Sequence, residues 1–267
     1  MRYEDYAAIP AMNWSTLKKG AASMLHLQHA IESDDDGDTP ARAVLRLNHA
    51  AVLEPDTLAS EFAVWTGDRR AGKEWELFKS THAARQIVKS DEMDAAREIA
   101  AAVMRHGAAR ELITGALTEH VIEWTDAETG VACKARLDVY QPGKAIADLK
   151  GDASTDEFAF ARRVGQLLYY GQAAWYQMAV EAKYGVRLPC YLIPYEQKPP
   201  TDVAVFEVGE DWLEPGRELC HRLLREYVEA RDSGVWPGRY NDVRPLPGPP
   251  KWINPDAADY TVETIED

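Results

Sequence analysis

VACKARLDVYQPGKAIADLK, residues 131–150, carries the strongest structural signal in the chain. It contains two runs rich in β-forming residues, 131–140 and 144–150, on either side of QPG, a sequence typical of a tight turn. A third run of the same kind, HVIEWT, precedes them at residues 120–125. Three such runs joined by short turns predict an antiparallel meander of three strands.

The alternation of side chains along these strands separates apolar from charged residues. In the second strand the apolar face is predicted to hold Val131, Cys133, Ala135, Leu137 and Val139, and the charged face Lys134, Arg136 and Asp138. In the third strand Asp148 and Lys150 lie side by side, and antiparallel pairing could bring Asp138 next to them. Two close carboxylates repel each other unless a cation lies between them, and Mg²⁺ prefers such oxygen ligands.

A lysine beside a metal ion can orient or deprotonate a water molecule, or stabilise negative charge as it develops. Two carboxylates and a lysine on one sheet face therefore indicate metal-assisted hydrolysis of a phosphodiester. The competing interpretation is a solvated face with surface ion pairs, and for a single Asp–Lys pair it is the better one. The acids lie at strand ends, where functional groups tend to gather, and this favours the site.

The order of these residues resembles a known nuclease core. Asp138, nine intervening residues and Asp148-Leu149-Lys150 across a strand–turn–strand are similar to the PD-(D/E)xK motif. The resemblance implies that both aspartates bind metal and that Lys150 is catalytic. Leu137 stands where the motif has a proline, a position that varies in the superfamily. The implied fold is α/β (α+β), with a restriction-endonuclease-like core and a central mixed sheet flanked by helices.

The helix predicted after the third strand extends the resemblance. Gln172 and Tyr176, four residues apart, share one face of this helix and resemble the QxxxY element of RecB-like nucleases, which supports the catalytic site. Gln166 and Tyr170 match the same pattern six residues earlier, but QAAWY is closer to the RecE-type version and favours Gln172. Without the strands upstream, Gln172 would be interpreted as an ordinary amide on a helix surface.

The segment NHAAVLEP, residues 48–55, resembles the HxxxLEP element of RecE-type exonucleases, the exonuclease VIII family. In that family the histidine is a metal ligand, whereas a lone His49 on an apolar helix would more often be a buried structural residue. The resemblance covers roughly residues 13–240. It implies a metal site made by His49, Asp138, Asp148 and the backbone carbonyl of Leu149. Mg²⁺ is the implied ion, with Mn²⁺ as a substitute.

The RecE-type resemblance also implies a function. It implies an Mg²⁺-dependent exonuclease without sequence preference, which digests linear duplex DNA ends 5′→3′ and leaves a 3′ single strand. A ring-shaped homo-oligomer, trimer or tetramer, and a single-strand annealing protein or recombinase as partner in a phage or prophage are further implications. Two alternatives stay open: a RecB-like nuclease of other polarity or with endonuclease activity, and a catalytically silent DNA-binding or assembly module. Iron–sulfur members are disfavoured because they need four cysteines, and this chain has three.

Outside the meander the sequence predicts mostly helices. Asn13 or Ser15 can cap a helix over residues 16–32, and Thr39 with Pro40 begins another that stops before Pro55. The remaining predicted elements are a strand at 61–66, two helices within 71–117 (one from Asp91 to about His106), a long helix ending near Tyr184, strands at 188–195 and 202–208, and a helix at 212–233.

These elements predict one nuclease domain. It comprises a mainly helical part with the histidine ligand (1–118), a catalytic core (119–235) and an irregular, Pro-rich and acidic tail (236–267). No apolar stretch approaches the roughly 18 residues of a membrane span. The N-terminus lacks a secretion signal pattern, so we expect a cytoplasmic protein in a bacterial host cell, with no membrane partner.

The formal net charge of −14 argues at first against a DNA partner, because phosphate binding usually leaves a basic footprint. Ten of these charges lie in residues 32–38 and 256–267, which we expect to face away from the DNA. Glu119 or Glu123 could add a carboxylate to the site, although the sequence favours surface acids for both. Candidate phosphate contacts are Lys134, Arg136, Arg69, Arg70, Lys73, Arg162 and Arg163, and a solvated face explains each pair equally well.

Overall fold

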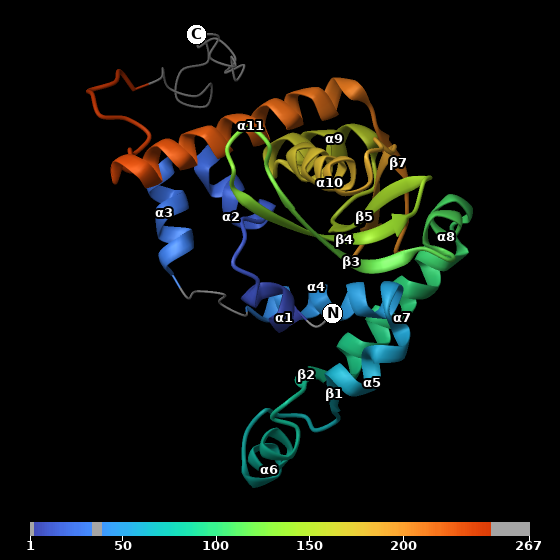
Figure 1. The fold of residues 1–267 in the computed structure, drawn as a ribbon. Helices are drawn as coiled ribbons and strands as arrows, with labels where there is room; N and C mark the ends of the chain where they lie inside the picture. Colours follow the sequence, from blue (N-terminus) through green and yellow to red (C-terminus); the bar gives the residue numbers. More distant parts are fainter. Residues whose placement is uncertain (1–2, 34–38, 247–267) are drawn as a thin grey trace, which may run out of the picture.

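A five-stranded mixed sheet forms the centre of the computed structural model, which describes residues 3–33 and 39–246 (Figure 1). In spatial order the strands are β3 (Leu117–Thr125), β4 (Ala132–Gln141), β5 (Ala145–Asp152), β6 (Cys190–Glu196) and β7 (Phe206–Val208). The first three strands are the predicted antiparallel meander, whereas β5 and β6 run parallel. The predicted α/β fold with a mixed sheet flanked by helices is confirmed.

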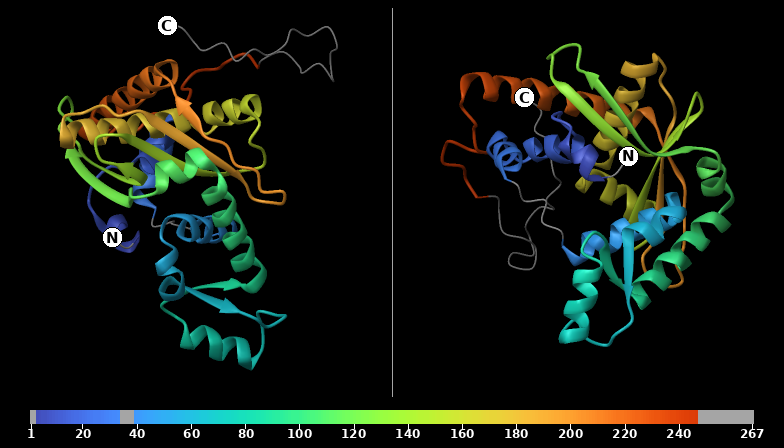
Figure 2. Two further views of the ribbon diagram at one scale, coloured as in Figure 1. Left: turned by 90° about the vertical axis from the view of Figure 1, so that its right-hand side faces the viewer. Right: turned by 60° about the horizontal axis from the view of Figure 1, so that its bottom comes forward.

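Helices cover both faces of this sheet (Figures 1 and 2). On one face α10 (Tyr169–Tyr184) packs on the sheet and α11 (Glu210–Ser233) covers α10, with α9 (Glu157–Gln166) beside them. On the other face lie α4 (Pro40–Leu53), α7 (Ser90–Arg105) and α8 (Gly107–Ile113). Each face buries its own hydrophobic core, so the residues between the two cores are fixed from both sides.

Two segments that were predicted as continuous helices are broken. The first consists of α2 (Trp14–Leu17), the 3₁₀ helix η1 (Lys18–Ala21) and α3 (Met24–Glu32), and follows α1 (Tyr3–Ala8). Asn13 caps α2 as predicted, but the Ser23 hydroxyl accepts a hydrogen bond from the His26 backbone N–H and begins a new helix. The second break separates α9 from α10 at Leu168, whose φ is 57°.

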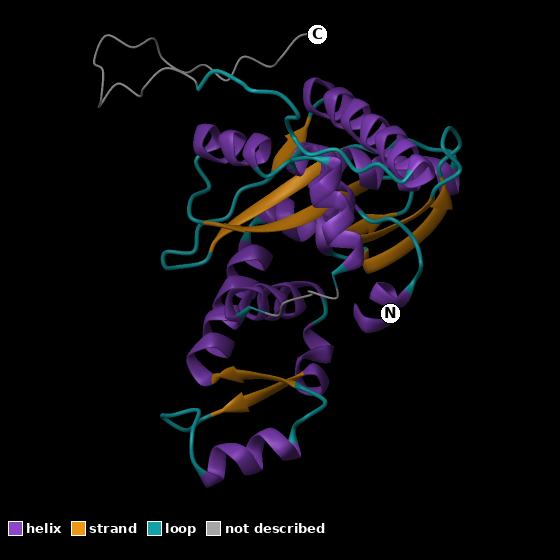
Figure 3. Cartoon of the chain, turned by 90° about the vertical axis from the view of Figure 1, so that its left-hand side faces the viewer, coloured by secondary structure: helices purple, strands orange, loops and turns teal. Residues whose placement is uncertain are grey.

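A small lobe projects from the body of the protein, away from the five-stranded sheet (Figure 3). This outer lobe, residues 58–89, contains α5 (Leu58–Glu61), β1 (Phe62–Trp65), α6 (Lys73–Thr81) and β2 (Gln86–Lys89), and follows η2 (Pro55–Thr57). β1 confirms the strand predicted at 61–66. β2 lies where helix was predicted, because a four-residue strand is too short to show a period, and it pairs parallel with β1. The short helix α8 was also not predicted separately.

The meander departs from regular pairing at one point. Thr118 pairs with Val139 and His120 with Leu137, but between them Glu119 has a φ of 51°, in the left-handed region. On β4, Val139 packs in the core beneath α7 and α8, whereas Leu137 packs in the core on the other face of the sheet. The expectation that these two residues share a face was therefore wrong. The irregular position brings Glu119 and Asp138 opposite each other.

Three further predictions concern the cysteines, membrane-spanning helices and the acidic segments. Cys133, Cys190 and Cys220 are buried and free, as the absence of paired cysteine motifs predicts. Across residues 3–33 and 39–246, no helix combines the length and apolar character needed to cross a membrane. Residues 34–38 and 256–267, which make up most of the two acidic segments, lie outside the described residues. The prediction that these segments face away from the DNA therefore concerns residues that the structure does not describe.

Candidate active site

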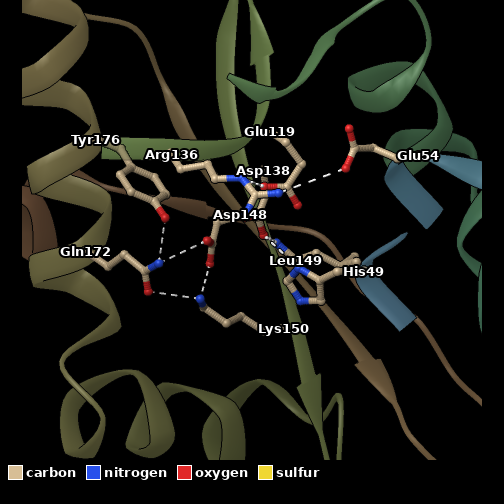
Figure 4. Close-up of polar contacts among 10 residues, drawn as sticks. All are labelled: His49, Glu54, Glu119, Arg136, Asp138, Asp148, Leu149, Lys150, Gln172 and Tyr176. Atoms are coloured by element: carbon tan, nitrogen blue, oxygen red, sulfur yellow. Dashed lines mark hydrogen bonds and ion pairs between the residues drawn. The ribbon is translucent and has the colours of Figure 1, made fainter. Parts of the chain in front are cut away.

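Seven side chains from five separate elements converge beside the irregular point of the meander (Figure 4). They are His49 from α4, Glu119 from β3, Asp138 from β4, Asp148 and Lys150 from β5, and Gln172 and Tyr176 from α10. Alternation along β5 turns Asp148 and Lys150 toward α10, while Ala147 and Leu149 pack on the opposite face. The sequence therefore predicted all of these positions except Glu119.

One half of the site is a hydrogen-bonded network around Asp148. Its carboxylate forms a close ion pair with the Lys150 ammonium, which also donates to Gln172 Oε1 at 3.0 Å. The Gln172 amide nitrogen donates to Asp148 Oδ1 at 3.2 Å and contacts the Tyr176 hydroxyl at 2.8 Å. The Lys150 and Asp148 side chains are only 12% and 5% exposed. Gln172, and not the exposed Gln166, is the amide that the fold places at the site.

The other half of the site groups three side chains that could hold a metal ion. One nitrogen of His49 and one carboxylate oxygen each of Glu119 and Asp138 lie within 4.8 Å of one another. Asp138 Oδ2 lies 3.5 Å from His49 Nδ1 and accepts a hydrogen bond from the Leu149 backbone N–H at 2.9 Å. This bond fixes the Asp138 carboxylate against β5, next to the carboxylate of Asp148.

The electrostatics of these groups fit a divalent cation. Burial, reinforced by the Asp138 carboxylate, raises the pKa of Glu119 to about 8, and burial raises the pKa of Asp148 to about 6. Burial and the nearby Lys150 lower the pKa of His49 to about 4, so its imidazole is neutral and able to bind a metal at pH 7. Oxygen and imidazole donors suit Mg²⁺ or Mn²⁺, and a cation between the carboxylates would relieve their repulsion.

Lys150 carries its proton in this environment. Burial alone would lower its pKa, but the carboxylates of Asp148 and Asp138 reverse that effect, and the pKa of Lys150 is raised. A protonated lysine donates hydrogen bonds and offsets negative charge, but it cannot accept a proton. The geometry therefore suits Lys150 to orient a water molecule or to stabilise charge on a phosphate.

Glu119 lies at the site, although the sequence favoured a surface position for it. Its side chain is 11% exposed, and its carboxylate lies 2.6 Å from Arg136 Nε. The interpretation of Glu119 as a surface acid is wrong, because the left-handed backbone at this position turns the side chain into the site. Glu123, in contrast, is exposed. Counting strand register outward from the turn at residues 126–130, which places position 119 opposite Asp138, is the signal that could have found it.

Arg136 connects the site to the HxxxLEP segment. Besides Glu119, its guanidinium lies 4.0 Å from the carboxylate of Glu54, which follows the last residue of α4. The ion pairs hold α4, and with it His49, against the strand that carries Asp138. Arg136 thus lies beside the site, where two carboxylates hold its side chain (Figure 4), and its role as a phosphate contact stays a prediction.

The other candidate phosphate contacts are not at the site. Lys134 is 3% exposed, and its ammonium donates to the carbonyls of Tyr6, Ala7 and Ile9 at 2.7–3.0 Å. Lys134 as a DNA contact was therefore wrong: it binds the C-terminal end of α1. The remaining candidates lie on α9 (Arg162, and Arg163, which is 3.3 Å from Asp152) and on the outer lobe (Arg69, Arg70 and Lys73).

A family profile and one solved structure agree with this fold. A family profile described as a PDDEXK-like domain of unknown function (DUF3799) matches residues 14–244. A solved structure from Eubacterium rectale, provisionally named an exonuclease, has 17% identity and a TM-score of 0.61 over 96% of this chain and 97% of its own. An alkaline exonuclease from Laribacter hongkongensis has 13% identity and a TM-score of 0.33 over 86% and 93%. No protein of curated function matches the sequence.

Proposed function

The chain belongs to the family of PDDEXK-like domains, and on that premise we propose that it is a divalent-metal-dependent exodeoxyribonuclease of RecE type. One observation carries the proposal: the buried Asp148–Lys150–Gln172 network lies directly beside the group of His49, Glu119 and Asp138. This arrangement combines a group able to hold a metal ion with a protonated lysine, two components that can support metal-assisted phosphodiester hydrolysis.

Each residue has a distinct role in this proposal. His49, Asp138, Asp148 and the Leu149 carbonyl would hold the metal, as the RecE-type resemblance implies, and Glu119 would be an additional ligand. When bound, the ion supplies Lewis-acid polarisation of a phosphate oxygen. Lys150 orients the attacking water and stabilises charge on the phosphate, and Gln172, braced by Tyr176, fixes Lys150 relative to Asp148.

The finer features of the proposal come from the RecE-type resemblance. We propose Mg²⁺ as the ion, with Mn²⁺ as a substitute, and 5′→3′ digestion of linear duplex ends without sequence preference. The 3′ single strand would pass to a single-strand annealing protein or recombinase, and the protein would act as a ring-shaped homo-oligomer. Contacts to phosphates carry no sequence information, which is consistent with nonspecific cleavage.

Digestion of end-labelled DNA tests this function. We expect linear duplex DNA to be degraded with Mg²⁺ or Mn²⁺ and to survive in EDTA, because hydrolysis depends on the metal ligands of the site. A 5′ label should be released as mononucleotide before a 3′ label, and covalently closed circular DNA should remain intact. Nicking of the circle would support an endonuclease instead. No digestion, together with no Mn²⁺ binding in isothermal titration, would support a catalytically silent module.

The outer lobe is proposed to contact the DNA backbone. The lobe, residues 58–89, contains six basic and four acidic side chains in a chain whose net charge is −14. Arg69 and Lys73 are exposed, and within the described part of the chain neither takes part in an ion pair. Arg70 lies over the Trp75 ring, 5.9 Å from its centroid, and pairs with Glu92 at 3.5 Å. The exposed basic side chains of the outer lobe are suited to contact the negatively charged DNA backbone.

The salt dependence of DNA affinity tests the outer lobe. Each phosphate contact adds about 0.9 to the slope of log K against log salt concentration. We therefore expect the double variant Arg69→Ala/Lys73→Ala to flatten that slope by about 2, measured in EDTA by fluorescence anisotropy with a labelled duplex. The matched control is Lys144→Ala/Lys183→Ala, which removes two exposed lysines of the sheet body. An equal change in both double variants would contradict a specific role of the lobe.

A further inference from the structure

The break between α9 and α10 is an unusual piece of backbone. Leu168, the residue before α10, has φ 57° and ψ 38°, a left-handed conformation that leucine rarely adopts because its Cβ crowds the backbone. Such outliers cluster at functional sites, where the surrounding structure holds them in place. The consequence here is that α10 begins at Tyr169, and its first turn carries both Tyr169 and Gln172 toward the site.

Tyr169 lies against the proposed catalytic lysine. The Lys150 ammonium is 4.5 Å from the centroid of the Tyr169 ring, well within the roughly 6 Å over which a cation is attracted to an aromatic face. The other partners of this ammonium are the Asp148 carboxylate and Gln172 Oε1. The Lys150 ammonium thus has three partners: a carboxylate, an amide oxygen and an aromatic ring. The amide of Gln172 and the ring of Tyr169 both belong to the first turn of α10.

We propose that Tyr169 is a positioning residue that holds the Lys150 ammonium in line with Asp148 and Gln172 through a cation–π contact. The four-carbon stem of a lysine is flexible, so one ion pair leaves the ammonium free to rotate about the carboxylate. A ring at the side of the ammonium restricts that motion, and the Leu168 conformation places the ring there. The inference rests on the proposed function, because its effect on rate is measured as nuclease activity.

Packing is the competing role for Tyr169. Its ring also lies 6.5 Å from that of Phe160, so its removal would loosen the contact between α9 and α10. A packing role depends on the size and shape of the ring. A cation–π role depends on the negative face of the ring, which fluorine substitution weakens with little change of shape. A series of rings of equal size therefore separates the two.

The experiment measures kcat on linear duplex DNA for a series at position 169. We expect Tyr169→Phe to stay within about twofold of wild type and Tyr169→Leu to lose about tenfold, the range of one buried cation–π contact. Phenylalanine with one, two and three ring fluorines at this position should lower kcat in steps, at unchanged Tm. Tyr170→Leu is the matched control, because Tyr170 is the adjacent tyrosine and contacts Trp212 at 5.9 Å. That variant should keep the wild-type kcat.

A second measurement does not depend on activity. An aromatic face at this distance shifts the ε-methylene protons of Lys150 upfield in the NMR spectrum of lysine-labelled protein, with Lys150→Met for assignment. The shift should persist in Tyr169→Phe and disappear in Tyr169→Leu. If wild type shows the shift but does not digest DNA, the positioning contact stands and the proposed function fails. A missing shift in wild type, or a kcat that does not respond to fluorination in an active enzyme, would overturn the proposal.

Discussion

Replacing Lys150 with methionine is expected to lower kcat on linear duplex DNA about 1,000-fold, the range of a single group that acts on the reacting atoms. Methionine keeps the unbranched apolar stem and removes the ammonium. The Asp148 carboxylate then loses its ion pair, and Gln172 Oε1 loses its donor. The variant has no ammonium at this position to orient water or to offset charge on the phosphate, and the metal ion alone remains to do so. Initial rates with saturating Mn²⁺ would measure the loss.

Lys144→Met is the matched control for this prediction. Lys144 lies in the turn between β4 and β5, is exposed, and shares the meander with Lys150. Its replacement should leave kcat within about twofold of wild type, since exposed positions tolerate such changes. Circular dichroism and Tm establish whether Lys150→Met is folded. A folded Lys150→Met protein with the activity of Lys144→Met would show that the catalytic group has been assigned wrongly.

Glu119→Gln is expected to weaken Mn²⁺ binding about 100-fold. Loss of a partner outside the ligand shell already costs 10–100-fold in affinity for many metal sites, and Glu119 offers a ligand atom itself. A neutral amide also leaves Arg136 without its closest carboxylate, which lies at 2.6 Å. The same change should reduce the stabilisation of the fold by excess Mn²⁺ by about 2.7 kcal/mol, the free energy of a 100-fold change in Kd.

Isothermal titration and thermal unfolding with and without Mn²⁺ measure both effects. The matched control is Glu123→Gln, the same substitution on the same strand at an exposed position. This variant should bind Mn²⁺ as wild type does. Equal Mn²⁺ affinities of Glu119→Gln and wild type would remove Glu119 from the metal site and leave it as a structural partner of Arg136.

Local patterns predicted most of the secondary structure. The meander could be predicted because alternating β-rich runs and the QPG turn act within twenty residues. Both ends of helix α4 could be predicted, because Thr39 and Pro40 are typical of a helix N-terminus and Pro55 stops the helix. The spacing of Asp138, Asp148 and Lys150 predicted which strands carry the candidate site. Side chains alternate along a strand and a short turn sets the pairing, so local geometry decides which of these side chains come together.

Features that depend on tertiary context could not be predicted in this way. The left-handed backbone at Glu119 and at Leu168 is imposed by surrounding contacts, and neither residue type favours it. Lys134 has the sequence character of a surface base, yet its partners are carbonyls of a helix more than 120 residues away. Strand β2 depends on its pairing with β1 across the outer lobe.

The site draws on elements that are far apart along the chain, and this bears on when activity can arise during synthesis. His49 leaves the ribosome early, the catalytic strands follow about 90 residues later, and Gln172 and Tyr176 come last. A nascent chain that ends before α10 has folded holds the carboxylates without the amide and the ring that fix the lysine. If the proposed function holds, we therefore expect activity to arise only after α10 has emerged and folded.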